Sequence, residues 1–410
     1  MMIIKKCAYI ITQNKNREIF ENCDILIEKN IIKKIGKNLK VNNAKEIISG
    51  KNKIIMPGLV NTHTHIGMHS LRGICDDEEL PKWLELVVKA EKKFSFEDIQ
   101  HNAEHACKEM LRFGTTTFCE MYQPVEPIIE GVKKFQIRAV LCPVLYDFMG
   151  TINKQFIAAK KIIEKSELEN SELLKIGLGF HSVYACSKEM LKKAKQYAQE
   201  KNLLTPIHIA ETRKERFDVQ DKHQKLPLEY LENLQVLDKN MLLVHGIWMT
   251  KGEVRMIGKH NAKVSHCPVS NMKLASGGTT PLMEMFEAGI KVGLGTDSVA
   301  SNNNMDMFEE MKITGLLHKY HRWDPSIITN QKIIDLATID GAACLNMEKE
   351  IGSLEEGKKA DIIAIDIGLH MKPISKQNVK SHIVYSANGN DVVDVIVDGK
   401  IVLRNKKELY

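Results

Sequence analysis

The pattern of apolar and polar positions divides the chain into two short β-type ends and a long middle. At both ends, short apolar runs are separated by turn residues, and Asp398-Gly399 predicts a hairpin turn. The runs that read as strands are residues 8–12, 24–28, 31–36, 361–366 and 392–400. We therefore predict a small β-sandwich that is built from both termini.

The middle of the chain alternates between strand-like and helix-like patterns. Its apolar runs begin near Ile54, Thr115, Arg138, Leu174, Leu204, Met241, Ala262 and Lys291. Between them lie amphipathic stretches of helical period, such as residues 188–199 and 304–318. Eight apolar strands alternating with helices are typical of a (β/α)₈ TIM barrel, in which every strand is buried on both faces.

An open, doubly wound α/β sheet is the alternative to the barrel. It is disfavoured because no glycine-rich phosphate loop follows the first strand, and because candidate ligands come from strands far apart in the sequence. The predicted organisation is a sandwich part at residues 1–57, a catalytic barrel at 58–354 and a second sandwich part at 355–410.

Polar residues of the metal-binding type end several of the predicted strands. His63-Thr64-His65 follows the apolar run 54–60, and two residues at this spacing on a strand point to the same side. Later apolar runs end at His208, His245 and Asp297. Because the carboxyl ends of all barrel strands meet on one face, we predict a metal-centred hydrolytic site there.

Imidazole and carboxylate together suit zinc, with Fe²⁺ or Mn²⁺ as other first-row candidates. The set His63, His65, His208 and Asp297 provides three neutral nitrogens and one carboxylate, and leaves one position open for water. His245 is open to three interpretations: a further ligand, a base that polarises the water, or a hydrogen-bonded core histidine.

Acid–base and substrate candidates surround this set. Glu211 lies three residues after His208, where a proton shuttle is favoured over a surface glutamate that opens the next helix. Asp297 is a candidate proton acceptor as well as a ligand, although a simple turn aspartate is common after glycine. Candidates for substrate contact are His181, Glu91, Trp83 (a residue type more often found in a core) and, more weakly, His266.

Composition narrows the class of protein. The net charge of +6 is modest and the lysines are scattered, so no nucleic-acid surface is expected. The N-terminus lacks a signal-type apolar run and no segment has the length of a membrane span, so we expect a cytoplasmic protein. Nine cysteines without CxxC spacing favour small buried hydrophobes over disulfides, and a nucleophilic role for Cys267 is disfavoured beside a metal-type site.

These motifs resemble the amidohydrolase superfamily over nearly the whole chain. The branch they resemble is that of 5′-methylthioadenosine/S-adenosylhomocysteine deaminases and their 5′-deoxyadenosine deaminase relatives. The segments that carry the resemblance are residues 57–65, 71–73, 114–117, 208–212, 245–246, 266–277 and 295–298. The stretch Ser-Asn-Met-Lys-Leu-Ala-Ser-Gly at 270–277 is the most specific to this branch.

The resemblance implies a zinc-dependent deaminase that converts an adenine nucleoside and water into the inosine analogue and ammonia. It implies one Zn²⁺ per subunit on the four ligands above, with Glu211 protonating the purine ring and His245 and Asp297 acting on the hydrolytic water. It also places Glu91 at the ribose hydroxyls and His181 and Ser301 at the substrate. Members of the family are often multimeric, so a homo-oligomer is expected.

One departure from the family bears on the substrate. Members that prefer S-adenosylhomocysteine use an arginine in the loop after the third strand, whereas residues 147–154 contain only Lys154 as a cation. We therefore expect smaller 5′-modified nucleosides, 5′-deoxyadenosine or 5′-methylthioadenosine, to be preferred. The rival interpretations are a guanine deaminase or triazine-type hydrolase on the same scaffold, and a catalytically inactive binding protein.

Overall fold

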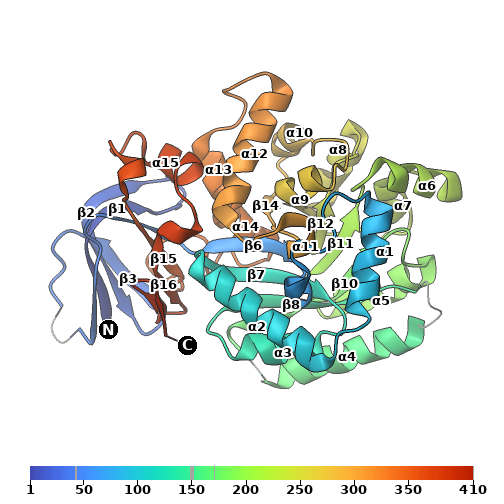
Figure 1. The fold of residues 1–410 in the computed structure, drawn as a ribbon, viewed down its shortest axis with the longest axis horizontal. Coiled ribbons are helices and arrows are strands. Elements are labelled where there is room, and N and C mark those ends of the chain that lie inside the picture. The colour runs from blue at the N-terminus through green and yellow to red at the C-terminus, as the bar shows by residue number, and fades with distance from the viewer. Residues whose placement is uncertain (42–43, 148–151, 170, 410) are drawn as a thin grey trace.

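Both chain ends pair in one mixed β-sheet beside the barrel, as Figure 1 shows for the computed structural model. The structure describes residues 1–41, 44–147, 152–169 and 171–409. The strands of this terminal sheet are β1 (Met2–Ile11), β2 (Ile19–Glu28), β3 (Ile31–Gly36), β4 (Glu46–Ser49), β5 (Lys53–Pro57), β15 (Ile362–Asp366), β16 (Val392–Val397), β17 (Lys400–Arg404) and β18 (Lys407–Glu408). Their order is β18-β17-β16-β15-β5-β1-β2-β3, with β4 paired to β1.

The terminal sheet has a core of its own. Ile4, Ile25 and Ile55 from the N-terminal strands are buried together with Ile362 and Ile396 from the C-terminal strands. The antiparallel pairing of β5 with β15 joins the two ends of the chain. The predicted β-domain from both termini is confirmed, and its strands belong to one continuous hydrogen-bonded sheet.

The middle of the chain forms the predicted barrel of parallel strands. These strands are β6 (Leu59–Thr64), β7 (Thr115–Tyr122), β8 (Arg138–Leu145), β9 (Leu174–Ile176), β10 (Gly179–Ser182), β11 (Thr205–Ile209), β12 (Met241–His245), β13 (Lys263–His266) and β14 (Val292–Leu294). The order β14-β13-β12-β11-β10-β8-β7-β6 follows the sequence. A parallel bridge between Thr64 and Asp297 brings the first and last strands together and closes the barrel.

The run predicted as one strand from Ile54 is in fact two strands. Gly58 separates β5 of the terminal sheet from β6 of the barrel: its N–H donates to the Asp361 carbonyl at 3.0 Å, whereas the next N–H, of Leu59, donates to Gly114 at 2.9 Å. A Cβ atom on Gly58 would lie 2.1 Å from Oγ1 of Thr116. The chain therefore needs glycine where it passes from one sheet to the other.

The fourth barrel position is shared by β9 and β10. Between them, the Gly177 N–H donates to Leu141 on the preceding strand, and the Leu178 N–H donates to Leu204 at the start of the following one, each at 3.0 Å. The strand predicted near Leu174 is thus divided into β9, which pairs with β8, and β10, which pairs with both β8 and β11 and carries His181 near its carboxyl end.

Helices pack around the barrel (Figure 1), and the predicted alternation of strands and helices in the middle of the chain is confirmed. They are α1 (Leu80–Glu91), α2 (Phe96–Arg112), α3 (Glu126–Lys133), α4 (Ile152–Glu169), α5 (Lys188–Glu200), α6 (Arg213–His223), α7 (Pro227–Asn233), α8 (Lys251–His260), α9 (Pro268–Lys273), α10 (Leu282–Glu287), α11 (Val299–Asn302), α12 (Met307–Arg322), α13 (Asn330–Leu336), α14 (Ile339–Cys344) and α15 (Val379–Tyr385). Helix α12 begins after Asp306, whose side chain accepts the Phe308 N–H and caps the helix.

Burial of the strands on both faces explains their unbroken apolar character. Outer-face residues such as Leu141 and Leu243 pack in one large cluster with helix residues such as Leu231. Val60 and Val244, from strands that are not neighbours in the sheet, belong to a second cluster inside the barrel. Within the described residues, no helix combines the length and apolar character needed to cross a membrane.

Candidate active site

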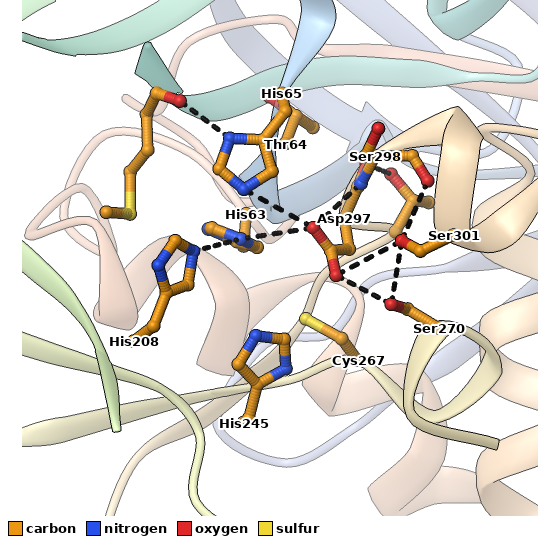
Figure 2. A network of polar contacts seen from close by, with 12 residues as sticks. His63, Thr64, His65, His208, His245, Cys267, Ser270, Asp297, Ser298 and Ser301 are labelled. Carbon is orange, nitrogen blue, oxygen red and sulfur yellow. Dashed lines mark hydrogen bonds and ion pairs between the residues drawn. The ribbon is translucent and has the colours of Figure 1, made fainter. Parts of the chain in front are cut away.

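Five ligand-type side chains converge at the carboxyl end of the barrel (Figure 2). They are His63 on β6, His65 directly after it, His208 on β11, His245 at the end of β12 and Asp297 after β14. The Nε2 atoms of His63 and His208 lie 3.2 Å apart. Oδ1 of Asp297 lies 3.5 Å from Nε2 of His63 and 3.4 Å from Nε2 of His65. The predicted ligands are therefore gathered around one point.

Unusual backbone geometry aims these side chains. His245 and Asp297 have φ angles of 74° and 64°, and Ala210, just after the strand that carries His208, has 50°. Positive φ is uncommon for residues with a Cβ atom, and such positions concentrate at functional sites. Each of these strands therefore turns sharply where it reaches the cluster.

Backbone carbonyls set the tautomers of two imidazoles. Nδ1 of His65 lies 2.7 Å from the Met121 carbonyl, and Nδ1 of His208 lies 2.9 Å from the His181 carbonyl. A carbonyl only accepts, so each Nδ1 carries the hydrogen and each Nε2 presents a lone pair to the centre. Nδ1 of His63 is buried and has no hydrogen-bond partner within the part of the chain that is described.

The pKa shifts in this cluster favour neutral imidazoles and an ionised Asp297. Burial lowers the pKa of His63 to about 4 and holds the pKa of His208 well below its ordinary value. Burial also opposes ionisation of Asp297, but its contact with His63 and the nearby His65 outweigh this and hold its pKa well below the usual range. The lone pairs of His65 and His208, the His63 imidazole and the Asp297 carboxylate face one point, and this donor set fits a divalent cation.

Glu211 and His245 lie beside this cluster. Oε2 of Glu211 is 3.7 Å from Nε2 of His245. Burial raises the pKa of Glu211, with the Asp297 charge adding to the effect and His245 opposing it. The other ring nitrogen of His245, Nδ1, contacts Oδ1 of Asn271 at 2.9 Å. The pair is placed to hold and move a proton next to the imidazole cluster.

The substrate-contact candidates occupy different surroundings. The His181 ring centre lies 5.2 Å from that of His208. Glu91 ends α1 and accepts a hydrogen bond from the Tyr122 hydroxyl at 2.7 Å, and burial raises its pKa. Trp83 packs in a cluster with Ala300, and its indole N–H is buried without a partner in the described ranges. An unpartnered N–H of this kind is available to a ligand.

Ser301 faces Asp297. Its hydroxyl is buried, 3.3 Å from Oδ2 of Asp297 and 2.8 Å from Oγ of Ser270. The purine contact predicted for Ser301 stays a prediction.

Three weaker sequence hypotheses involve other residues. Nε2 of His266 lies 3.2 Å from Nε2 of His318, a buried pair behind the site. Burial raises the thiol pKa of Cys267 well above the ordinary value, so a nucleophilic role is not supported. All nine cysteines are free and buried, as the sequence predicts. Residues 148–151 of the loop discussed above lie outside the described residues, and Lys154 is exposed on α4.

Two buried glutamates that sequence reasoning missed hold the site loops. Glu120 on β7 accepts the Ile66 N–H at 2.9 Å, directly after His65. Glu215 accepts the N–H groups of Ala210 at 3.0 Å and Glu211 at 2.9 Å. The sequence held a signal for each of them. Glu120 is a lone glutamate inside the apolar run 115–122, and Glu215 lies three residues after Thr212 at a helix start.

Comparison with known proteins assigns the family. Residues 54–402 match the model of the amidohydrolase family. The chain belongs to this family. It is therefore a hydrolase that acts on C–N bonds.

Curated relatives resemble the chain along most of its length. A 5′-deoxyadenosine deaminase from Methanosphaera stadtmanae is 40% identical over 95% of this chain and 91% of its own length. A 5-methylthioadenosine/S-adenosylhomocysteine deaminase from Thermococcus sibiricus is 39% identical over 98% of this chain and 94% of its own length. A crystal structure of an adenosine deaminase from Xanthomonas campestris with bound zinc superimposes with a TM-score of 0.95 at 27% identity, covering 100% of this chain and 94% of that chain.

Proposed function

We propose that this amidohydrolase is a zinc-dependent deaminase of adenine nucleosides that are modified at the 5′ position. The observation that carries the proposal is the convergence of three Nε2 atoms and the Asp297 carboxylate on one point. The names of the relatives at 39–40% identity support the nucleoside substrate. A guanine deaminase or triazine-type hydrolase is less favoured, because those relatives are named nucleoside deaminases.

His63, His65, His208 and Asp297 would hold the metal, and His245 lies within reach of the same cluster. A bound Zn²⁺ supplies hydroxide at neutral pH by lowering the pKa of coordinated water to near 7. Fe²⁺ or Mn²⁺ would suit the same donors. The carbonyls of Met121 and His181 orient His65 and His208 for this task.

The chain's own groups manage the protons. Glu211, whose pKa is raised by burial, holds a proton at neutral pH more readily than an exposed glutamate. It would donate this proton to a purine ring nitrogen, which makes the neighbouring C6 carbon electrophilic. Asp297 and His245 would take one proton of the attacking water and pass it to the departing amino group. Glu211 would recover its proton from the new hydroxyl on C6, so that ammonia leaves and the hypoxanthine nucleoside remains.

The remaining candidates would recognise the nucleoside. Glu91 would accept the ribose hydroxyls, with Tyr122 orienting it, and the free indole N–H of Trp83 would bind a substrate acceptor. His181, whose ring lies beside that of His208, would contact the substrate as well. Among the 5′-modified nucleosides, we propose that 5′-deoxyadenosine and 5′-methylthioadenosine are preferred over S-adenosylhomocysteine, since residues 147–154 contain no arginine.

The test is an ammonia-release assay of the zinc-loaded enzyme on 5′-deoxyadenosine, 5′-methylthioadenosine, S-adenosylhomocysteine, adenosine and guanine. We expect turnover of the adenine nucleosides, followed by the absorbance change from adenine to hypoxanthine. The highest kcat/KM on S-adenosylhomocysteine would contradict the proposed preference. Enzyme with one zinc per chain that releases no ammonia from any adenine nucleoside would refute the proposed function.

A further inference from the structure

We propose that Ser270 is a positioning residue that fixes the orientation of the Asp297 carboxylate for metal binding. The inference rests on the proposed function, because it concerns the same metal site. Ser270 lies in the first turns of α9, on a segment 27 residues away from Asp297 in the sequence. Its hydroxyl is 2.6 Å from Oδ2 of Asp297, and Figure 2 shows it on the side away from the imidazoles.

The two oxygens of Asp297 have different surroundings. Oδ1 accepts the Ser298 N–H at 2.8 Å and is the oxygen that faces His63 and His65. Oδ2 receives the hydroxyl of Ser270. A carboxylate that is hydrogen-bonded through both oxygens has lost its rotation about the Cβ–Cγ bond. Oδ1 is therefore presented to the metal position before any ion binds.

The hydroxyls of Ser270 and Ser301 both contact Asp297 and one another. Oγ of Ser301 lies 2.8 Å from Oγ of Ser270 and 3.3 Å from Oδ2 of Asp297, whereas the contact of Ser270 with Oδ2 is the shorter one at 2.6 Å. Hydrogen bonds that share partners in this way polarise one another. Both serines are buried, so water does not compete for these hydroxyls.

Glu310 on α12 ties together the two short helices that carry the serines. It accepts the side-chain N–H of Asn302 on α11 at 2.6 Å and the N–H of Val269 on α9 at 3.4 Å. Asn302 also donates to the Thr296 carbonyl at 2.8 Å, next to Asp297. One buried carboxyl group therefore links the helices that carry the two serines, and the contact between these hydroxyls is not a chance contact between loops.

The test measures zinc affinity by competition with a chromogenic chelator, which requires no turnover. Partners of metal ligands typically contribute about 10–100-fold to metal affinity, so we expect Ser270→Ala to weaken zinc binding by that factor. Ser301→Ala, which removes the hydroxyl with the longer contact to Oδ2 of Asp297 (3.3 Å), should weaken zinc binding less. Ser353→Ala is the matched control, because this buried serine bonds Glu355 in a part of the chain remote from the site.

A double-mutant cycle separates positioning from general destabilisation. In an Asp297→Ala background, Ser270→Ala should have no further effect on zinc affinity, because the group that it orients is gone. An unchanged affinity in folded Ser270→Ala, or an equal loss with and without Asp297, would overturn the inference. If Ser270→Ala does not fold, the same criteria apply to Ser301→Ala. Wild-type protein that binds no zinc would instead defeat the proposed function.

Discussion

Two buried polar clusters of the barrel differ in how their charges are satisfied. Where the barrel meets the terminal sheet, Arg138 donates to Asp361 at 3.0 and 3.3 Å and to the Glu172 carbonyl at 2.9 Å. Asp361 also accepts the Asp398 N–H at 2.7 Å. At the opposite end of the strands, the Nε2 atoms of His63 and His208 face each other beside the Asp297 carboxylate, which forms no ion pair with a lysine or arginine in the described part of the chain.

The comparison separates a structural cluster from a binding site. The Arg138 cluster is complete, so it joins two parts of the fold and has no capacity left for a ligand. The imidazole cluster collects more acceptors than donors, because the Nε2 atoms of His65 and His208 and the Asp297 carboxylate all face its centre, and this arrangement costs free energy until a cation occupies it. Burial alone does not distinguish the two; the balance of donors and acceptors does.

Metal removal should give the largest effect. Dialysis against a chelator should abolish ammonia release and leave the circular dichroism spectrum folded, because the apolar cores do not depend on the imidazole cluster. Added zinc should restore activity. Full activity in protein shown to be free of divalent metal would contradict the account.

Glu211→Gln should have the second largest effect. We expect turnover to fall by roughly 10²–10⁴-fold, because the variant lacks the general acid. Zinc content should stay at the wild-type level, since Glu211 is placed beside His245 and not among the four ligands. The matched control is Glu253→Gln, at a buried glutamate that caps α8, which should keep wild-type turnover. Loss of zinc from Glu211→Gln would make Glu211 a ligand.

Arg138→Met tests the complete cluster. Removing one partner of a buried ion pair typically costs about 3–5 kcal/mol in the free energy of unfolding, because Asp361 would keep a buried and unpaired charge. Urea unfolding should show this loss, and zinc affinity should not change. Arg138→Met/Asp361→Leu should recover part of the stability. A single variant as stable as wild type would show that the cluster contributes little.

The pH profile should give the smallest and most specific effect. Glu211 must be protonated to donate, and burial raises its pKa, so kcat/KM should fall as the pH rises through that raised value. The residual activity of Glu211→Gln should lack this alkaline decline, because an amide does not titrate. The same decline in the variant would assign it to another group.

Local signals predicted the barrel and most of the site. His63, His65, His208 and Asp297 end or follow apolar strands, so their convergence follows from strand direction in a parallel barrel. The break at Gly58 was missed because it depends on how close Thr116 approaches in the folded chain.

The supporting residues were missed for a related reason. Ser270 contacts Asp297, which lies 27 residues away in the sequence, and Glu120 contacts Ile66, which lies 54 residues away. The local sequence pattern contains no sign that such pairs come together. Glu215 binds its own loop only four or five residues away, and a strong helix-start pattern masked its second role.

The most direct test of the account is an anomalous-scattering map at the zinc absorption edge, from crystals of the protein grown with zinc. The account predicts one strong peak between Nε2 of His63, His65 and His208 and Oδ1 of Asp297. An internal control is the buried pair of His266 and His318, whose Nε2 atoms are also 3.2 Å apart. Among the described residues, this pair has no carboxylate partner. A peak at that pair, or no peak at the four ligands, would contradict the central claim.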